Sequence, residues 1–165
     1  MDTCTPDLLA LCEQVALALR QRGWQLVTAE SCTGGLIAAT CTGLSGSSDW
    51  LDRGYVTYSN AAKTADLGVP AELLAQWGAV SEPVVRAMAE GALRHSQAQV
   101  AVAVTGVAGP TGGSIDKPVG TVWLGWATPQ GVIAEAQHFA GDRDAVRHAT
   151  VRHALAGLLR HLPTA

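Results

Sequence analysis

The sequence predicts an α/β fold, specifically a three-layer α/β/α sandwich around a mixed, mostly parallel sheet. Amphipathic helical patterns alternate with short apolar strand patterns along most of the chain, as expected where helices cross between strands of one sheet. The run 100–104 is a nearly unbroken apolar segment, which is typical of a strand buried on both faces. The last two strand patterns flank the turn sequence 129–131, which predicts an antiparallel hairpin and therefore a mixed sheet.

The composition indicates one folded domain, which we place over residues 1–165. Hydrophobic residues make up 48% and charged residues 15%, so the chain can bury one substantial core and disorder is excluded. The net charge of −3, without any run of Lys or Arg, argues against nucleic-acid binding through phosphate neutralisation. No stretch approaches ~18 apolar residues, so no membrane span is expected. The N-terminus lacks the pattern of a secretory signal, and we expect a cytoplasmic protein.

The first elements are marked by capping residues and by apolar spacing. Leucine and valine at helical spacing predict a helix over 7–22, for which Thr5 is a suitable cap and Pro6 a suitable first residue. A short apolar strand is expected over 24–28. The next helix is expected over 31–40, beginning directly in the turn that follows this strand.

The middle of the chain contains one further strand and three helical segments. A strand is expected over 54–58, followed by a helix over 61–67 with Asn60 as its cap. A short helical segment follows Pro70. Ser81 is the expected cap of a longer amphipathic helix, because an acidic residue and a proline occupy its first turn.

The last third contains a long loop, a hairpin and a terminal helix. Glycine and proline dominate the loop 105–117, and a loop of this length in a compact domain favours a functional role. The two strands of the hairpin are expected over 119–127 and 132–139. The final helix is expected over 143–162.

Candidate chemistry lies in three segments that follow expected strands: the turn at Ser31, the segment 58–63, and the loop 105–114. Active sites of open α/β sheets gather at strand ends and in the loops beyond them. If the sheet brings the three segments together, the site combines a hydroxyl nucleophile, an amine base, a phenol and a Gly-rich anion cradle.

Each candidate residue also has an alternative role. Ser31 is either a nucleophile or a plain helix cap, and Lys63 is either its base or a solvated helix lysine, since no His lies near these loops. Tyr58 either contributes its phenol to the site or packs at a strand end with its hydroxyl in water. Cys32 is a rival nucleophile or a small buried hydrophobe, and Glu30 either pairs with a cation or orients the turn.

Neither a metal site nor a cofactor is expected. The four cysteines have no Cys-x-x-Cys spacing and are expected to be reduced thiols: Cys4, Cys12, Cys32 and Cys41. The histidines are scattered, and His148 and His153 are too far apart to stack on one face of a helix.

Five motifs in order, spanning nearly the whole chain, resemble the CinA C-terminal domain family. They are Thr28-Ala-Glu-Ser-Cys-Thr-Gly-Gly35, Gly54-Tyr-Val-Thr-Tyr-Ser-Asn60 with Lys63, Gly78-Ala-Val-Ser81, Ala103-Val-Thr-Gly-Val-Ala-Gly-Pro-Thr-Gly-Gly113 and Lys117-Pro-Val-Gly-Thr-Val122. The combination is highly specific, whereas a lone Gly-rich loop is weak support for any family.

The resemblance implies an activity and catalytic roles. Stand-alone members of the family are nicotinamide-nucleotide amidohydrolases, which convert nicotinamide mononucleotide to nicotinic acid mononucleotide and ammonia. By this resemblance Ser31 attacks the carboxamide carbon, Lys63 manages its proton, and Tyr58 assists proton transfer or orientation. Longer relatives carry an additional N-terminal domain associated with ADP-ribose pyrophosphatase activity, and this chemistry is not transferred to the present chain.

The resemblance also implies where a small-molecule nucleotide binds. Backbone N–H groups of residues 32–35 are expected at the oxyanion, and the loop 109–114 and Arg143 near the ribose phosphate. The expected substrate-binding residues are Cys32, Thr33, Gly34, Gly35, Asn60, Thr105, Gly106, Gly109, Gly112, Gly113 and Arg143. The alternatives are a nucleotide-binding module without catalysis and hydrolysis of a different amide. An apolar chain with five tryptophans is also expected to form a homo-oligomer, with a dimer favoured.

Overall fold

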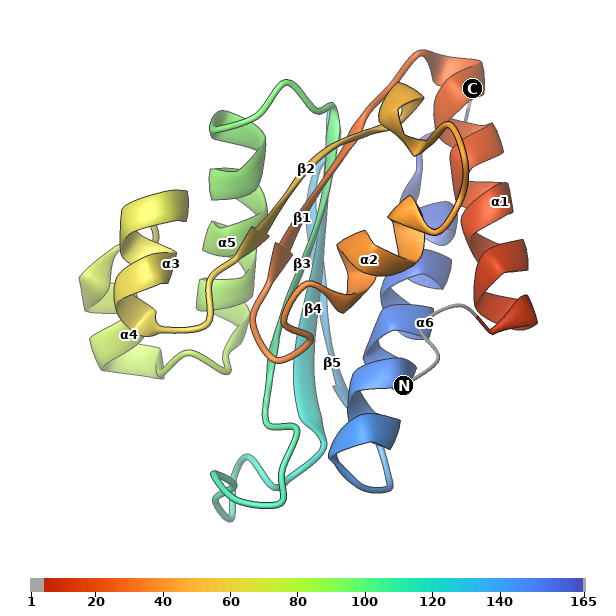
Figure 1. The fold of residues 1–165 in the computed structure, drawn as a ribbon. Coiled ribbons are helices and arrows are strands. Elements are labelled where there is room, and N and C mark those ends of the chain that lie inside the picture. Colours follow the sequence, from red (N-terminus) through yellow and green to blue (C-terminus); the bar gives the residue numbers. More distant parts are fainter. Residues whose placement is uncertain (1–4, 165) are drawn as a thin grey trace.

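Two helical layers enclose one sheet in the computed structural model, which describes residues 5–164 (Figure 1). The helices are α1 (Pro6–Arg22), α2 (Leu36–Thr42), α3 (Asn60–Leu67), α4 (Ala71–Trp77), α5 (Glu82–Arg94) and α6 (Arg143–His161), with a short 3-10 helix η1 (Ser47–Asp49). The strands are β1 (Leu26–Glu30), β2 (Leu51–Val56), β3 (Val100–Gly106), β4 (Thr121–Thr128) and β5 (Gly131–His138). The predicted three-layer α/β/α sandwich is confirmed.

The five strands lie in the order β2-β1-β3-β4-β5. β1 pairs in parallel with both β2 and β3, while β4 pairs antiparallel with β3 and with β5. Four of the five strands therefore run in one direction, which agrees with the prediction of a mixed, mostly parallel sheet. Because the single reversed strand lies between two others, two of the four pairings are antiparallel, which is more than the prediction implied.

Each face of the sheet carries its own apolar core. Leu26, Val102 and their same-face neighbours pack under α1, α2 and α6, together with the fully buried Trp50 and Trp126. Residues of the opposite parity, such as Ala101, face α3, α4 and α5 (Figure 1). Burial on both faces explains why β3 is a continuous apolar run without the alternation of a half-exposed strand.

A close helix–sheet contact explains one glycine of the last helix. A Cβ atom built at Gly157 in α6 would lie 2.1 Å from the ring of Trp126 in β4. The indole N–H of Trp126 donates a hydrogen bond to the carbonyl oxygen of Ala154 over 2.9 Å. Glycine at this position therefore lets α6 approach the sheet and lets a buried Trp satisfy its polar atom.

Several predicted boundaries and caps are wrong. The first strand is 26–30 rather than 24–28, because pairing with two neighbours holds the chain extended as far as Glu30. The second is 51–56, so Tyr58 lies beyond its end. Ser59 caps α3 in place of Asn60, because the Ser59 hydroxyl accepts the Ala62 N–H over 3.0 Å. Ser81 precedes α5 but makes no side-chain cap, because its hydroxyl donates to the Gly78 carbonyl oxygen.

Within residues 5–164, no helix combines the length and the apolar character needed to cross a membrane. Cys12, Cys32 and Cys41 are buried free thiols. The remaining cysteine, Cys4, lies outside the described residues.

Candidate active site

Ser31 follows β1 at the carboxyl end of the strand and begins a tight turn. Its N–H donates to the carbonyl oxygen of Val104 over 3.1 Å, and its own carbonyl oxygen accepts the Gly34 N–H over 3.0 Å. The helix that follows begins only at Leu36, with Gly35 in the cap position. The expected helix over 31–40 therefore starts too early, and the alternative that Ser31 is a plain cap is wrong. Its hydroxyl is available for other contacts.

The carboxylate of Glu30 does the capping instead. Ile37 and Ala38 belong to the first turn of α2, and the carboxylate accepts their N–H groups over 2.8 and 3.0 Å. A negative charge at this end of a helix is also favoured by the helix dipole. Of the two roles predicted for Glu30, orientation of the turn is the one that the structure shows.

Lys63 reaches Ser31 from α3. Its Nζ lies 3.0 Å from Ser31 Oγ and 2.8 Å from the carbonyl oxygen of Thr57. The side chain is only 1% exposed, so the alternative of a solvated helix lysine is wrong. Burial lowers the pKa of Lys63 from its ordinary value, and the neighbouring Cys32 opposes this effect only in part. The amine is thus more easily neutral here than in water, which a base requires.

The pKa of the neighbouring Cys32 thiol is shifted in the opposite direction, upward. Burial raises the pKa of Cys32 to about 11, and Glu30 adds to this increase. The backbone N–H of Cys32 itself opposes it most strongly, followed by Arg147 and Lys63. The nucleophilic form of cysteine is the thiolate, which is scarce at neutral pH when the pKa is this high. Both residues line the same cavity, but it is the Ser31 hydroxyl that lies 3.0 Å from the Lys63 amine, so Ser31 is the candidate nucleophile.

A cavity of about 240 Å³ opens beside Ser31. Its lining residues follow or end β1 and β3, so it lies at the carboxyl ends of these two strands. The segments that follow β1, β2 and β3 leave the sheet at this same edge (Figure 1). Eight of the predicted site residues line it: Ser31, Cys32, Tyr58, Asn60, Lys63, Thr105, Gly106 and Arg143. Sequence segments separated by more than a hundred positions thus converge on one small polar hollow, as expected for this class of sheet.

Arg143 and Tyr58 form the exposed mouth of this cavity. The Arg143 guanidinium donates from Nη2 to the Tyr58 hydroxyl over 2.8 Å and from Nη1 to the Gly109 carbonyl oxygen over 2.9 Å. Arg143 is the first residue of α6, and the Asp142 side chain caps this helix by accepting the Ala145 N–H. One guanidinium therefore ties the segment after β2 to the Gly-rich loop.

Six predicted substrate-binding residues do not line the cavity. Thr33 is fully buried. Gly34 and Gly35 have φ angles of +60° and +95°, which shape the turn. Gly109 contacts Arg143 through its carbonyl oxygen. Gly112 and Gly113 line a separate open hollow within the loop 110–119, so the structure does not bring them to Ser31.

Some residues that were not predicted as site residues lie at the cavity or contact the turn beside it. Ala79 and Val80 line it, and the Thr105 hydroxyl donates to the Ala79 carbonyl oxygen over 2.9 Å, which anchors this segment to the end of β3. Arg147 donates to the carbonyl oxygen of Thr33 over 2.9 Å. Its spacing of four residues from Arg143, on one face of α6, is the signal that could have identified it.

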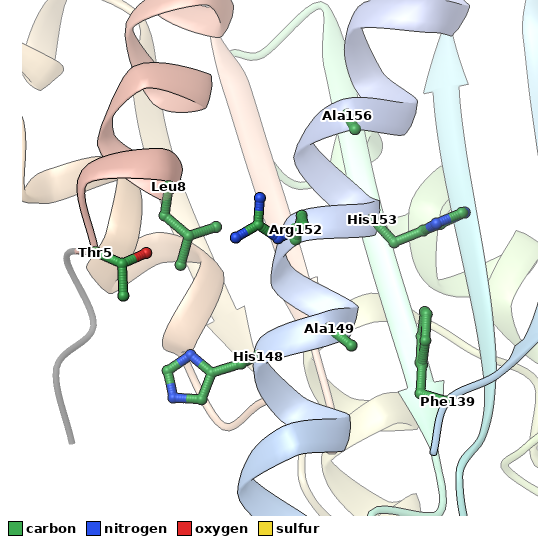
Figure 2. A pocket seen from close by; sticks show the side chains of 8 residues that line it. All are labelled: Thr5, Leu8, Phe139, His148, Ala149, Arg152, His153 and Ala156. Carbon is green, nitrogen blue, oxygen red and sulfur yellow. The ribbon is translucent and has the colours of Figure 1, made fainter. Parts of the chain in front are cut away.

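A larger hollow of about 630 Å³ lies elsewhere, between the start of α1 and α6 (Figure 2). Its lining is mostly apolar, and its charged groups have other partners: Arg152 lies 3.6 Å from Asp7, and His153 contacts Glu135. No residue pair in it resembles a nucleophile with its base. Within residues 5–164, no three His, Cys, Asp or Glu side chains are grouped so as to hold a metal ion. Chemistry, rather than volume, identifies the smaller cavity as the candidate site.

Comparison with known proteins identifies the family of the chain. The family described as the CinA C-terminal domain matches residues 9–162. The chain is 55% identical over 150 residues to the nicotinamide-nucleotide amidohydrolase PncC of Escherichia coli K12, covering 90% of this chain and 91% of that protein. It is 58% identical over 142 residues to PncC of Pseudomonas putida, covering 86% and 89%. The crystal structure of the competence/damage inducible protein CihA from Agrobacterium tumefaciens superposes with a TM-score of 0.93 at 45% identity, covering 97% of this chain and 98% of that one. The chain therefore belongs to the CinA C-terminal domain family.

Proposed function

We propose that this chain hydrolyses the carboxamide of nicotinamide mononucleotide to nicotinic acid mononucleotide and ammonia, as part of pyridine nucleotide recycling. The observation that carries the proposal is the buried contact of 3.0 Å between Lys63 Nζ and Ser31 Oγ at the wall of a polar cavity. Relatives that carry this activity in their name are more than half identical to the chain over most of its length.

In the proposed first step, neutral Lys63 takes the proton of Ser31 while Oγ attacks the carboxamide carbon. An unperturbed lysine has a pKa of about 10.4 and is almost fully protonated at pH 7, so the lowered pKa matters. The Thr57 carbonyl oxygen accepts one N–H of the amine, and the lone pair of the neutral amine can then accept the proton of the Ser31 hydroxyl 3.0 Å away. Nucleophile and base are thus aligned before the substrate arrives.

The tetrahedral intermediate carries a negative oxygen that needs hydrogen-bond donors. The N–H of Cys32 adjoins the nucleophile, and no carbonyl oxygen among residues 5–164 accepts it. The Gly34 N–H is already bound to the Ser31 carbonyl oxygen, so fewer donors remain in the turn than the run 32–35 suggests. Each donor of this kind contributes roughly 3 kcal/mol to the stability of the transition state.

The second half of the reaction releases ammonia and then the acid. The Lys63 ammonium returns its proton to the departing nitrogen as the C–N bond breaks, which leaves an ester on Ser31. Lys63 is then neutral again and activates a water molecule, which attacks the ester carbon. The acid is released and the proton on Lys63 passes back to Ser31 Oγ, so that the enzyme is regenerated.

The nucleotide would lie with its carboxamide against Ser31 and its phosphate toward the mouth of the cavity. Arg143 is the cation at that mouth, and Tyr58, which is 60% exposed, stands beside it. A guanidinium suits a phosphate because its donors match the phosphate oxygens in pairs. Asn60 and the end of β3 at Thr105 and Gly106 would contact the remainder of the substrate.

The proposal extends to the domain boundaries, the cellular location and the oligomeric state. We infer one amidohydrolase domain over residues 1–165, a cytoplasmic location and a homodimer. The dimer is supported by large apolar side chains that are about half exposed, among them Trp77 at 49% and Leu17 at 59%. Light scattering on the purified protein tests the oligomeric state.

Ammonia release from nicotinamide mononucleotide, with chromatography of the products, tests the reaction. We expect turnover by the wild type, loss of about 10³-fold or more in Ser31→Ala, and activity within about threefold of wild type in Cys32→Ala. If folded Ser31→Ala keeps wild-type turnover, the nucleophile is misassigned. Binding of the nucleotide by the wild type without product would indicate a binding module, and turnover of other amides alone would indicate a different substrate.

A further inference from the structure

The proposed chemistry makes no use of the Glu30 carboxylate, although this group is the immediate neighbour of Ser31. Its side chain is fully buried, and among residues 5–164 no cation forms an ion pair with it. Four neutral donors surround it instead: Thr28 Oγ1 at 3.2 Å, Thr33 Oγ1 at 2.7 Å, Ile37 N at 2.8 Å and Ala38 N at 3.0 Å. A buried charge of this kind is stable only while its donors remain in place.

Thr33 is the donor that connects this carboxylate to the turn. It is fully buried, and its hydroxyl makes the shortest of the four contacts with Glu30. Its carbonyl oxygen accepts the Arg147 guanidinium over 2.9 Å and the Leu36 N–H over 3.2 Å. One residue therefore joins the end of β1, the start of α2 and the face of α6.

We propose that Thr33 is a positioning residue, which fixes the turn carrying Ser31 by linking the Glu30 carboxylate to the Arg147 guanidinium. This inference rests on the proposed function, in which Ser31 is the nucleophile. Thr33 does not line the cavity, so it acts through the turn and not on the substrate. A displacement of about 1 Å between reacting groups can cost on the order of 10²-fold in rate.

The two threonines that donate to Glu30 differ in what else holds them. Thr28 lies inside β1, which is paired with β2 and β3 on its two sides. Loss of its hydroxyl leaves this strand in place. Thr33 lies outside the sheet, where its contacts with Glu30 and Arg147 hold the turn. Thr28→Val is therefore a matched control for Thr33→Val, because both remove one donor from the same carboxylate.

The test compares steady-state turnover of nicotinamide mononucleotide in Thr33→Val, Thr33→Ser and Thr28→Val. In Thr33→Val we expect kcat to fall by about 10- to 100-fold, with KM within about threefold of wild type. Thr33→Ser keeps the hydroxyl and restores kcat to within about threefold. Thr28→Val keeps the wild-type kcat.

Hydrogen exchange of the backbone amides of residues 32–35 gives a second readout that needs no catalysis. These amides should exchange faster in Thr33→Val but not in Thr33→Ser or Thr28→Val. Arg147→Met, a change at a partly exposed position, removes the guanidinium contact with the Thr33 carbonyl oxygen and should show the same fall in kcat and the same faster exchange. This variant tests the link even where Thr33→Val does not fold.

Wild-type kcat and exchange in Thr33→Val or in Arg147→Met overturn the proposal. Equal falls of kcat in Thr28→Val and Thr33→Val overturn it as well, because they indicate a general loss of stability. If the wild type forms no product from nicotinamide mononucleotide while Thr33→Val still exchanges faster at 32–35, the proposed function fails and the role of Thr33 in holding the turn stands.

Discussion

The turn 31–35 and the loop 107–120 are both rich in glycine and both follow strands of the sheet, yet they are built differently. The turn is held by buried polar contacts: Ser31 with Lys63, and Thr33 with Glu30 and Arg147. The loop is mostly exposed and holds an open hollow, and at its tip Ile115 is 100% exposed. Glycine content alone therefore does not identify a reactive segment. The difference lies in burial: the Lys63 and Glu30 side chains that contact the turn are buried, whereas residues 110–116 of the loop are exposed.

The largest expected effect compares Lys63, which contacts the turn from α3, with Lys117, which lies in the loop. Lys63→Met removes the proposed base and should lower kcat by about 10³-fold or more. Lys117→Met should leave kcat within about threefold, because the Lys117 ammonium donates to the Trp77 carbonyl oxygen at the surface and does not line the cavity. Steady-state ammonia release measures both. Comparable losses in the two variants would show that the loop belongs to the catalytic machinery.

The second prediction concerns pH. Because only the neutral amine is a base, kcat/KM should rise by about tenfold per pH unit while Lys63 is mostly protonated, and level off above its lowered pKa. Folding stability should also rise with pH between that lowered pKa and the ordinary value of 10.5, because the unfolded chain then binds a proton that the folded chain does not.

A pH series of initial rates, with chemical denaturation at each pH, checks both parts of this prediction. Lys117→Met is the control and should keep the wild-type profile of rate and of stability. A rate profile that stays flat as pH increases would exclude Lys63 as the base.

The third prediction compares glycines with positive φ. Gly34 has φ of +60° and Gly112 has φ of +87°, and a Cβ atom at either would meet no atom closer than 3.7 Å. Alanine at either position should therefore cost a similar ~1 kcal/mol of stability through backbone strain. Gly34→Ala should also lower kcat by about tenfold, because the strained turn carries Ser31.

Gly112→Ala should keep kcat within about twofold of wild type, because Gly112 lines a separate hollow and not the cavity. Thermal unfolding and steady-state kinetics on both variants separate the two effects. A tenfold loss of kcat in Gly112→Ala would indicate that Gly112 belongs to the binding site, as predicted from the sequence.

The smallest expected effect concerns the phenol at the mouth of the cavity. Tyr58→Phe removes the acceptor of the Arg143 hydrogen bond and should lower kcat/KM by about threefold to tenfold, as for one charge-assisted hydrogen bond at an exposed site. Tyr55→Phe is the control, since the Tyr55 hydroxyl bonds to the His95 carbonyl oxygen away from the cavity. A loss above about 10²-fold in Tyr58→Phe would instead indicate direct proton transfer by the phenol.

Much of the fold and part of the site could be predicted from the sequence. Apolar periodicity located the helices and strands, since burial on one face or on two leaves a direct pattern in the residues. The sequence pattern did not identify correctly which residues cap the helices. Asn60 has the right residue type for a cap, but Ser59 makes the hydrogen bond. Several polar residues near a helix start can cap it, and small differences in backbone direction choose among them.

The sequence alone determined the order of the elements, the two-sided burial of β3 and the three segments that carry polar chemistry. The tertiary structure decided which of these residues meet. Sheet pairing brings Ser31 beside Val104, and the packing of α3 places Lys63 Nζ within 3.0 Å of Ser31 Oγ. It also leaves Gly112 outside the cavity. Local patterns record burial because burial acts on each residue separately, whereas a distance between two side chains depends on every element that is packed between them.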